Sequence, residues 1–558
     1  MTPTSSNLRR HEIDHPLMFL ALLAICTGCQ SGGDTTSTGA FVASAEPYPL
    51  SPEMELVEKD LGSDTYVQLL KAMTNPHDRR VEYQRLDSSD NAANFLERHG
   101  ELEQIQADEQ LRTAYERRKQ IAGAFEALLQ REIGERPKPV ATQDLPPAAA
   151  SASSADIEIL PVVASPAWAK NWPRWRGPTG QGTSSETELP ATWDHEKNVA
   201  WKAEVPGSGN SSPVIWGDRI FLVTAFDDGQ KRALVCLRRS TGEILFQKET
   251  PDADPQAKIV PKTGYAAATP ATDGERVVLF LGNVGLLCYS TDGELLWRYA
   301  VGPFNGSHGT GASPLIWNDL VILMQEQNGG PSLGVAVDKK TGQKRWSTER
   351  QPALGWCSPI AVRVAGRDQL LYAAKHIVVG IDPASGNEIW SCAGPTKEVV
   401  PTLLYGNGLV YCTSGRSGPT LAIQPNGEGD ITKSHLLWRS PRGGPHVPSP
   451  VLWNDLLYLV NDTGIFSCLD AKTGAKVYQQ RLGGRFTSSL LAADGKIYAT
   501  SEKGKTFVIR TGRTYELLSA NDLGESVLSS GAILDGQIFL RGEKHLFAIG
   551  EMRKVAQN

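Results

Sequence analysis

Polar and aromatic side chains recur just upstream of a repeated Ser-Pro pair, and they are the best candidates for binding a ligand. His308 lies in NGSHGTGASP and His446 lies in RGGPHVPSP, each among glycines that allow a ligand or backbone to approach closely. The equivalent positions of other copies complete a predicted ligand-binding rim of six residues: Asn210, Tyr265, His308, Trp356, His446 and Arg485. The alternative is a solvated loop mouth that binds nothing.

Catalytic and metal-binding motifs are absent from the sequence. The ten histidines form no His-Glu-x-x-His motif, and no pair among the six cysteines after Cys29 has the spacing of zinc ligands. Three cysteines occupy one equivalent slot of a buried strand, where a free thiol acts as a small apolar side chain: Cys236, Cys288 and Cys468. A disulfide in an oxidising compartment could join one pair among Cys357, Cys392 and Cys412. We therefore expect no catalytic residue and no metal site.

A repeated element must position the rim. The segment SPVIWGDRIFL begins at Ser212, and it returns as SPLIWNDLVIL from Ser313 and as SPVLWNDLLYL from Ser449. With divergent copies included there are eight between Ser212 and Arg541, and those that keep the proline lie 42 to 57 residues apart. A recurrent spacing of this length indicates a repeated structural unit.

Each unit predicts four strands. Dipeptides such as Gly217-Asp218 and Asn318-Asp319 tolerate positive φ and favour a tight turn between two apolar runs. A second glycine turn follows, as in DKKTG before Trp346, and leads into a strand with an aromatic residue. Four strands in roughly 40–45 residues are typical of a propeller blade. We predict an all-β fold, an eight-bladed β-propeller of four-stranded antiparallel blades.

The aromatic residue of each unit is predicted to pack one blade against the next, which is a structural role. These blade-docking residues are Trp201, Phe246, Trp297, Trp346, Trp390, Trp438 and Tyr478. The first of them lies in a lone strand, residues 198–205, and the last unit lacks its outer strand. We predict that this N-terminal strand closes the ring, because closure removes an exposed sheet edge.

The tandem Asp-x-x-Thr-Gly-x-x-x-Trp turns and the lead-in NWPRWRGPTGQGTSS resemble the pyrroloquinoline-quinone (PQQ) repeat β-propellers over residues 171–550. That family includes quinoprotein dehydrogenases and the non-enzymatic propeller lipoprotein of the outer-membrane barrel-assembly machinery. The dehydrogenases imply an adjacent Cys-Cys disulfide against the quinone, an Asp base and Glu, Asn and Asp ligands for calcium. This sequence has no Cys-Cys pair, and only Trp356 is suited to stack on a quinone. We therefore expect no cofactor; PQQ is the one candidate whose binding should be tested.

The residues before the propeller predict export. Residues 1–29 combine Arg9 and Arg10 with a short apolar run and CTGCQ, which resembles a lipoprotein signal with Cys29 as the lipidated residue. An ordinary cleaved signal peptide is the alternative. Residues 30–50 are predicted to be a flexible tether, 51–134 an α-helical region and 135–170 a Pro/Ala/Ser linker. The helical region is either a docking arm or a small bundle without a binding role.

The function predicted from these features is that of a non-catalytic scaffold or recognition module in the cell envelope. Its partner would be an envelope protein or an extended peptide bound by blade loops and edges. The membrane would be reached through the lipid anchor, with the propeller in the periplasm. A net charge of −6 without a dense Lys/Arg stretch argues against nucleic acid. The alternatives are a PQQ-dependent dehydrogenase of alcohols or sugars and a small-ligand sensor that uses the rim; the oligomeric state is left open.

Overall fold

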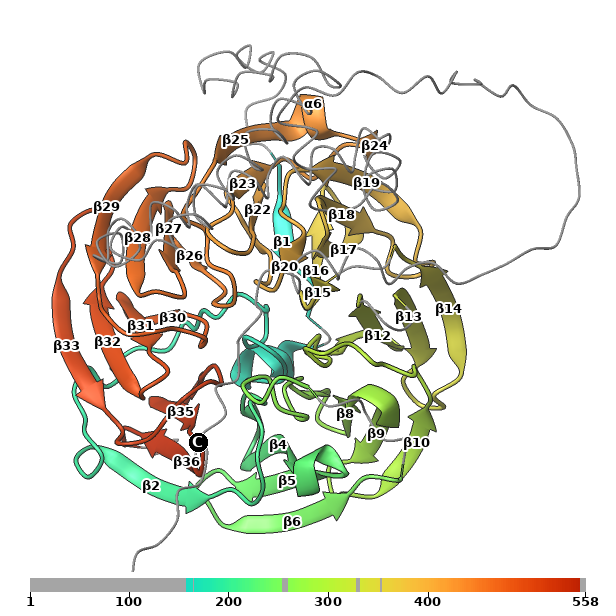
Figure 1. The fold of residues 1–558 in the computed structure, drawn as a ribbon, viewed down its shortest axis with the longest axis vertical. Helices are drawn as coiled ribbons and strands as arrows, with labels where there is room; N and C mark the ends of the chain where they lie inside the picture. Colours follow the sequence, from blue (N-terminus) through green and yellow to red (C-terminus); the bar gives the residue numbers. More distant parts are fainter. Residues whose placement is uncertain (1–156, 164, 253–258, 328–331, 352–353, 552–558) are drawn as a thin grey trace, which may run out of the picture. The chain divides into compact units, whose positions relative to one another are not determined.

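The computed structural model describes residues 157–163, 165–252, 259–327, 332–351 and 354–551. The predicted signal peptide with Cys29, the tether, the helical region and most of the linker lie outside the described residues. Within them, eight sheets stand around a common axis like the blades of a propeller (Figure 1). The predicted eight-bladed β-propeller of four-stranded antiparallel blades is confirmed.

In each of the first seven blades, the four strands run from the inside of the ring to its outer edge in sequence order. The first four blades comprise β3 (Val214–Trp216), β4 (Arg219–Phe226), β5 (Lys231–Arg238) and β6 (Ile244–Glu249); β7 (Ala271–Thr272), β8 (Arg276–Phe280), β9 (Leu286–Ser290) and β10 (Leu295–Tyr299); β11 (Leu315–Trp317), β12 (Leu320–Gln325), β13 (Leu333–Asp338) and β14 (Lys344–Glu349); and β16 (Ile360–Val364), β17 (Arg367–Ala374), β18 (Ile377–Ile381) and β19 (Glu388–Ala393).

The next three blades comprise β21 (Leu404–Gly406), β22 (Leu409–Thr413), β23 (Thr420–Ile423) and β25 (Leu436–Ser440); β26 (Val451–Trp453), β27 (Leu456–Val460), β28 (Ile465–Asp470) and β29 (Lys476–Arg481); and β30 (Leu491–Ala493), β31 (Lys496–Thr500), β32 (Lys505–Arg510) and β33 (Leu517–Asp522). Blade 8 contains β34 (Ala532–Leu534), β35 (Gln537–Arg541) and β36 (His545–Ile549), and its outer strand is β2 (Val199–Glu204). Strand β2 pairs antiparallel with β36, with Trp201 opposite Ala548.

Antiparallel order gives the propeller two different faces. The first-to-second and third-to-fourth strand connections of every blade lie at one end, which we call the turn face. The remaining connections, including those between blades, lie at the other end, which we call the loop face. Short turns suit the turn face because residues such as Asn318 and Asn454 adopt positive φ there (50° and 54°). The predicted rim residues all belong to connections on the loop face.

Blade 4 is wider than the others. Strand β1 (Ile159–Pro161) pairs with its innermost strand, and β24 (Gly429–Asp430) adds parallel to its outermost strand, β19. Strands β15 (Leu354–Gly355) and β20 (Glu398–Val399) form a small parallel pair on the loop face. The described helices are short: η3 (Pro166–Lys170), η4 (Asp227–Gly229), η5 (Gly282–Val284) and α6 (Thr432–His435). None of the helices in the described ranges has the length and apolar character to span a membrane.

Tryptophans join neighbouring blades through one recurrent contact. The indole N–H of Trp297 donates to the carbonyl of Lys339 in the next blade (2.9 Å), and its ring covers the turn glycine Gly342. A Cβ at Gly342 would lie 2.8 Å from the ring, which explains why the Asp-x-x-Thr-Gly turn repeats its glycine. The same arrangement recurs for Trp201 with Arg239, Trp346 with Pro383 and Trp438 with Ala471.

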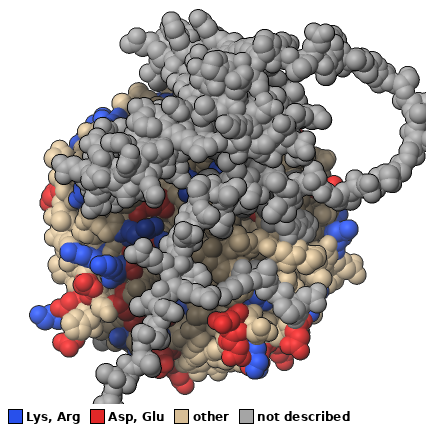
Figure 2. Space-filling model, viewed as in Figure 1, with Lys and Arg blue, Asp and Glu red and all other residues tan. Residues whose placement is uncertain are grey.

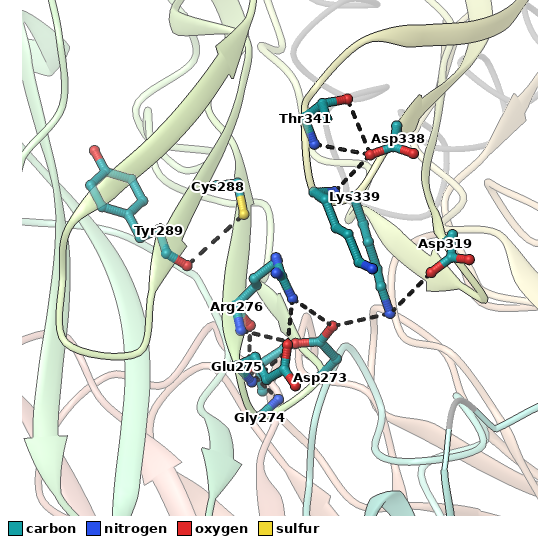
Figure 3. A network of polar contacts seen from close by, with 12 residues as sticks. Asp273, Gly274, Glu275, Arg276, Cys288, Tyr289, Asp319, Asp338, Lys339 and Thr341 are labelled. Atoms are coloured by element: carbon teal, nitrogen blue, oxygen red, sulfur yellow. Dashed lines mark hydrogen bonds and ion pairs between the residues drawn. The ribbon is translucent and has the colours of Figure 1, made fainter.

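Ion pairs on the turn face reinforce these contacts. Figure 3 shows Lys339 of blade 3 between Asp319 of its own blade and Asp273 of blade 2. Its Nζ lies 3.4 Å from Asp273, whose side chain is 9% exposed and also faces Arg276. Partial burial reduces the screening that weakens an exposed pair. The interface between blades 2 and 3 is therefore held by an indole and a lysine from opposite blades.

Two of the predicted docking aromatics depart from this pattern. Trp390 is fully buried, and its indole donates to Gln369 Oε1 of its own blade at 2.8 Å, so it anchors blade 4 internally beneath β24. Tyr478 packs edge-on against Tyr515 of blade 7, with ring centroids 5.8 Å apart. In the interface between blades 7 and 8, Trp193 from the segment before β2 stacks on Tyr498.

Candidate ligand-binding rim and lead-in segment

A circle of hydroxyl groups underlies the predicted rim. One serine or threonine per blade, just before the inner strand, is buried, and together they form what we call the hydroxyl belt: Ser212, Thr269, Ser313, Ser358, Thr402, Ser449, Ser489 and Ser530. In seven cases the hydroxyl accepts the backbone N–H of its counterpart in the neighbouring blade at 2.9–3.1 Å. The eighth hydroxyl, Thr402 Oγ1, accepts from the indole N–H of Trp175. The serine of the repeated Ser-Pro pair thus has a structural role that the sequence did not reveal.

Trp356 and His308 lie together on the loop face. Their ring centroids are 5.8 Å apart, with the rings edge-on at 65°. The indole N–H of Trp356 donates to the carbonyl of Gly309, and its backbone N–H donates to Val399. His308 is exposed and Trp356 is half-buried. The tryptophan therefore binds two inter-blade loops together, and the histidine covers its edge.

His446 belongs to a group of nitrogen-bearing side chains around one carboxylate. Its Nε2 lies 3.3 Å from Glu398 Oε2, which also accepts from Arg416 Nε at 2.8 Å. Lys397 approaches the other carboxylate oxygen at 3.7 Å. Burial of the Glu398 carboxyl acts to raise its pKa, but the hydrogen bond and charge of Arg416, with His446 and Lys397, outweigh burial, so this pKa lies below the ordinary value of 4.5.

Asn210 and an ion pair next to Arg485 hold one loop in place. Lys262 in this loop, which connects blades 1 and 2, forms a 2.6 Å ion pair with Glu502 of blade 7. Arg485 approaches the second oxygen of Glu502 at 4.0 Å. On the other side, Asn210 Nδ2 donates to the carbonyls of Lys262 and Thr263, both at 2.9 Å. The loop thereby reaches from blade 1 across to blade 7.

Tyr265 ends the same loop. Its ring lies against Gly229, where an added Cβ would fall 2.2 Å from the ring, and the Arg232 guanidinium lies 5.7 Å from its centroid. The six predicted rim residues thus fall into two groups, one around this loop and one around Trp356 and Glu398. In both groups the side chains brace loops against each other.

These residues do not fit the quinone site that the dehydrogenase resemblance implies. The chain has no adjacent cysteine pair, and the Trp356 indole is bonded to Gly309 with His308 at its edge. Over the described ranges, no group of three His, Cys, Asp or Glu side chains is placed to hold a metal ion. The His446–Glu398 pair shares its carboxylate oxygen with Arg416, as in a structural ion pair.

Several charged partners of the rim were missed at the sequence level. Glu398 and Glu502 lie outside the repeated motif, so no pattern marks them. Glu326 is 2% exposed and pairs with Arg350 at 2.6 Å, while Arg350 lies 5.2 Å from the ring of Tyr372. Burial raises the pKa of Glu326, and the charge of Arg350 opposes that rise only in part. This pair is the most deeply buried ion pair of the described loop face.

The lead-in segment, which we define as residues 165–193, is the largest feature that sequence reasoning left without a role. Its first part, including η3, lies at the centre of the ring (teal in Figure 1). Arg176 is buried and donates at 2.5–3.4 Å to five carbonyls, those of Gly180, Gln181, Ser449, Pro450 and Leu490. Burial lowers the pKa of Arg176 to about 9. This side chain fastens the segment to blades 6 and 7.

Other lead-in residues bind further blades. Trp172 exchanges two backbone hydrogen bonds with Ile215 of blade 1, and the Pro173 carbonyl accepts from Thr272 of blade 2. Gln181 donates to the Leu403 carbonyl and accepts from Tyr405 N–H in blade 5. The segment therefore contacts inner strands on opposite sides of the ring.

The six described cysteines are buried and free. Cys357, Cys392 and Cys412, among which the sequence left a disulfide open, are not bonded to one another. Burial raises the pKa of the Cys236, Cys288 and Cys357 thiols to about 12 and that of Cys392 and Cys468 to about 11. Cys236, Cys288 and Cys468 occupy the third strands of their blades, where a small apolar side chain fits.

A groove of about 520 Å³ separates blades 1 and 2 on the turn face. It exists where Phe246 takes the place of a docking tryptophan, and Trp216 and Leu245 line it with Phe246. At its edge, Arg219 donates to Asp292 at 2.7 Å and so links the two blades. Elsewhere, on the face drawn in Figure 2, acidic and basic side chains of the described residues are interspersed.

Comparisons with known proteins agree with this architecture. A family model described as outer membrane protein assembly factor BamB matches residues 256–434 and 407–522. The crystal structure of BamB from Moraxella catarrhalis aligns with 11% identity and a TM-score of 0.47, covering 64% of this chain and 99% of that chain. No curated protein matches the sequence.

Two solved enzymes share the fold. A europium-containing methanol dehydrogenase aligns with 12% identity and a TM-score of 0.54, covering 68% of this chain and 90% of that one. Quinohemoprotein alcohol dehydrogenase from Comamonas testosteroni aligns with 10% identity and a TM-score of 0.52, covering 71% and 83%. At such identity the likeness concerns the fold alone. The predicted resemblance to PQQ-repeat propellers is confirmed, and the similar structures include both BamB and dehydrogenases.

Proposed function

We propose that this protein is a non-catalytic recognition module of the cell envelope that binds an extended segment of a partner protein across blades 1 and 2. One observation carries the proposal. Ile244 on β6 and Leu295 and Leu296 on β10 are 38%, 44% and 45% exposed at the outer strands of adjacent blades. We call these three residues the apolar edge. Exposed apolar side chains on the outer strands of neighbouring blades favour a protein-binding surface.

The adjoining groove supports an extended occupant. Trp216 and Phe246 offer aromatic surface next to the apolar edge, and the Arg219–Asp292 pair offers polar atoms beside them. The outer strands also expose unpaired backbone, which is the usual template for strand addition. The fold itself contains such an addition, because β24 extends blade 4 at its outer strand, with Trp390 opposite Gly429. A partner strand with apolar residues at alternate positions would match β6 or β10 in the same way.

Placement in the envelope rests on different support. The family match to an outer membrane assembly factor favours a periplasmic protein that contacts other envelope proteins. The signal-like residues 1–29 favour export, with Cys29 as the lipid anchor. The rim residues support a catalytic role less well than a structural one, because their side chains connect loops through hydrogen bonds and ion pairs.

The test is site-specific photo-crosslinking in membranes of the source cell. A photoreactive phenylalanine at position 244 or 295 should give one dominant protein adduct. Leu517 on blade 7 is the matched control, because it is an outer-strand leucine with 43% exposure. Leu295→Glu with Leu296→Glu should abolish capture by a probe at 244, whereas Leu517→Glu should leave it unchanged. Equal capture from 244 and 517, or capture that survives the double variant, would refute the proposed surface.

A further inference from the structure

The lead-in segment contains two buried arginines, Arg174 and Arg176, which differ in their hydrogen bonding. Arg176 donates to five backbone carbonyls. Arg174 is equally buried, at 3% exposure, but its Nε and Nη2 have no hydrogen-bond acceptor among the described residues. The described part of the chain also gives Arg174 no ion pair with a carboxylate. A buried cation without acceptors or a counter-ion is costly, so each such group requires an explanation.

Trp168 adds a second orphaned donor at the same place. The Arg174 guanidinium lies 5.8 Å from the Trp168 ring centroid. Trp168 is 1% exposed, and its Nε1 has no acceptor among the described residues. Indole and guanidinium nitrogens donate hydrogen bonds and accept none. The pair therefore presents three unmatched donor nitrogens, with four N–H groups between them, and one positive charge.

The surroundings hold this guanidinium in place. An added Cβ at Gly180 would lie 3.1 Å from Arg174 Nη2 and 3.0 Å from Ile360 of the blade 4 inner strand, so both groups pack tightly against this glycine. Gly180 also has φ of +74°, which favours glycine on backbone grounds. Burial lowers the pKa of Arg174 to about 10, against a smaller opposing effect of Tyr405. A counter-ion would relieve this destabilised charge.

We propose that Arg174 and Trp168 form a binding site for a small inorganic anion near the axis of the propeller. The ligand must be an acceptor on several sides and carry negative charge, as a halide or a tetrahedral oxyanion does. A bulky organic acid is disfavoured because both side chains are almost fully buried. The bound anion would neutralise the charge of Arg174, where the lead-in segment meets the inner strands. Its role would be to stabilise the ring, independently of partner binding at the apolar edge.

The test titrates purified full-length protein with chloride, bromide, sulfate or phosphate, using sodium gluconate to hold ionic strength constant. Because a ligand of the native state raises Tm by mass action, at least one anion should raise it saturably. Arg174→Met should weaken that binding at least about tenfold, and Trp168→Phe, which keeps a ring, by about three- to tenfold. Trp193→Phe is the matched control, since Trp193 Nε1 also lacks an acceptor in the described chain but its ring stacks on Tyr498.

A second readout locates the anion. Crystals soaked in bromide should show an anomalous peak within hydrogen-bond distance of Arg174 and Trp168. If Arg174→Met does not fold, Trp168→Phe and the bromide peak decide the question without it. The proposal is overturned if no anion acts saturably on the wild-type protein, which would mean that water satisfies these donors. It is equally overturned if folded Arg174→Met keeps the full effect, or if bromide binds only elsewhere.

Discussion

The backbone N–H of Ser530 donates to the side-chain oxygen of Ser212 at 3.0 Å, across 318 positions of sequence. This bond joins blade 8 to blade 1 within the hydroxyl belt. The same hydrogen bond occurs at six other junctions between neighbouring blades, so most junctions are held by polar contacts as well as by packing. The belt is a polar ring inside an apolar core, and its energy depends on every member having a partner.

Removal of one belt hydroxyl should therefore cost more than its size suggests. Ser212→Ala leaves the buried N–H of Ser530 without an acceptor, and we expect a loss of about 1–3 kcal/mol in the free energy of unfolding. Urea denaturation followed by tryptophan fluorescence measures this loss. Ser385→Ala, at an exposed turn serine, should stay within about 0.5 kcal/mol of wild type. Equal effects of the two variants would show that the belt adds nothing.

The outer strand of blade 8 allows a test of ring closure. Trp201→Ala removes a ring that covers Gly242 and contacts Phe539, and we expect a loss of about 3 kcal/mol, at the low end for Trp→Ala because this Trp is only half-buried. Trp201→Phe should lose about 1 kcal/mol, mainly the hydrogen bond to Arg239. Deletion of residues 198–205 should speed amide exchange throughout β34–β36. A deletion variant that melts like the parent would contradict closure by β2.

Acid should weaken the loop face through Glu398. Its pKa lies below 4.5 in the folded protein, so its ionised form favours folding at neutral pH. That contribution is lost as the pH falls below about 4.5 and through the folded-state pKa. Unfolding free energies between pH 7 and pH 3 should fall less steeply for Glu398→Gln than for wild type. Glu516→Gln removes an exposed partner of Arg510 and should leave the slope unchanged; a slope unaffected by Glu398→Gln would refute the assignment.

The described thiols should be unreactive in the native protein. Burial and pKa values of about 11–12 keep five of them protonated at pH 8, and burial also raises the pKa of Cys412 well above its ordinary value. With Cys26 and Cys29 replaced by serine, a thiol reagent should label fewer than one cysteine in buffer and six in guanidinium. An added Ser385→Cys should label at once. A disulfide among Cys357, Cys392 and Cys412 in mass spectra would contradict the free state.

PQQ separates the proposed module from a dehydrogenase. A quinone dehydrogenase site needs stacking on both faces and a cation beside the carbonyls. Trp356 is held by Gly309, and the chain has no adjacent cysteines. Calorimetry with PQQ and calcium should show no stoichiometric binding, and no alcohol or sugar should reduce a dye. Micromolar binding with turnover would establish the enzyme, whereas binding without turnover that Trp356→Ala abolishes would favour a sensor.

The repeats made the fold predictable because each blade is specified locally by its turns and its aromatic residue. Rim residues could be placed on one face for the same reason. Their partners could not be predicted, because Glu398, Glu502 and Arg416 lie outside the repeated motif and meet the rim only in space. The lead-in segment was recognisable as a motif, yet Arg176 bonds to carbonyls 273 to 314 positions away. The pairing of β24, an insertion in the next unit, beside Trp390 could not be predicted either, because no other unit contains this strand.

Strand β2 has a consequence for how the chain is made. Val199 pairs with Ile549, so β2 is synthesised hundreds of residues before β36, the one strand that pairs with it in the described part of the chain. Throughout that interval it carries an unpaired backbone edge, which is a template for wrong pairing. Contacts of such long range also slow folding, because the connecting chain loses much entropy when its ends meet. Chaperones that shield unpaired strand edges should therefore matter most to this protein before blade 8 is complete.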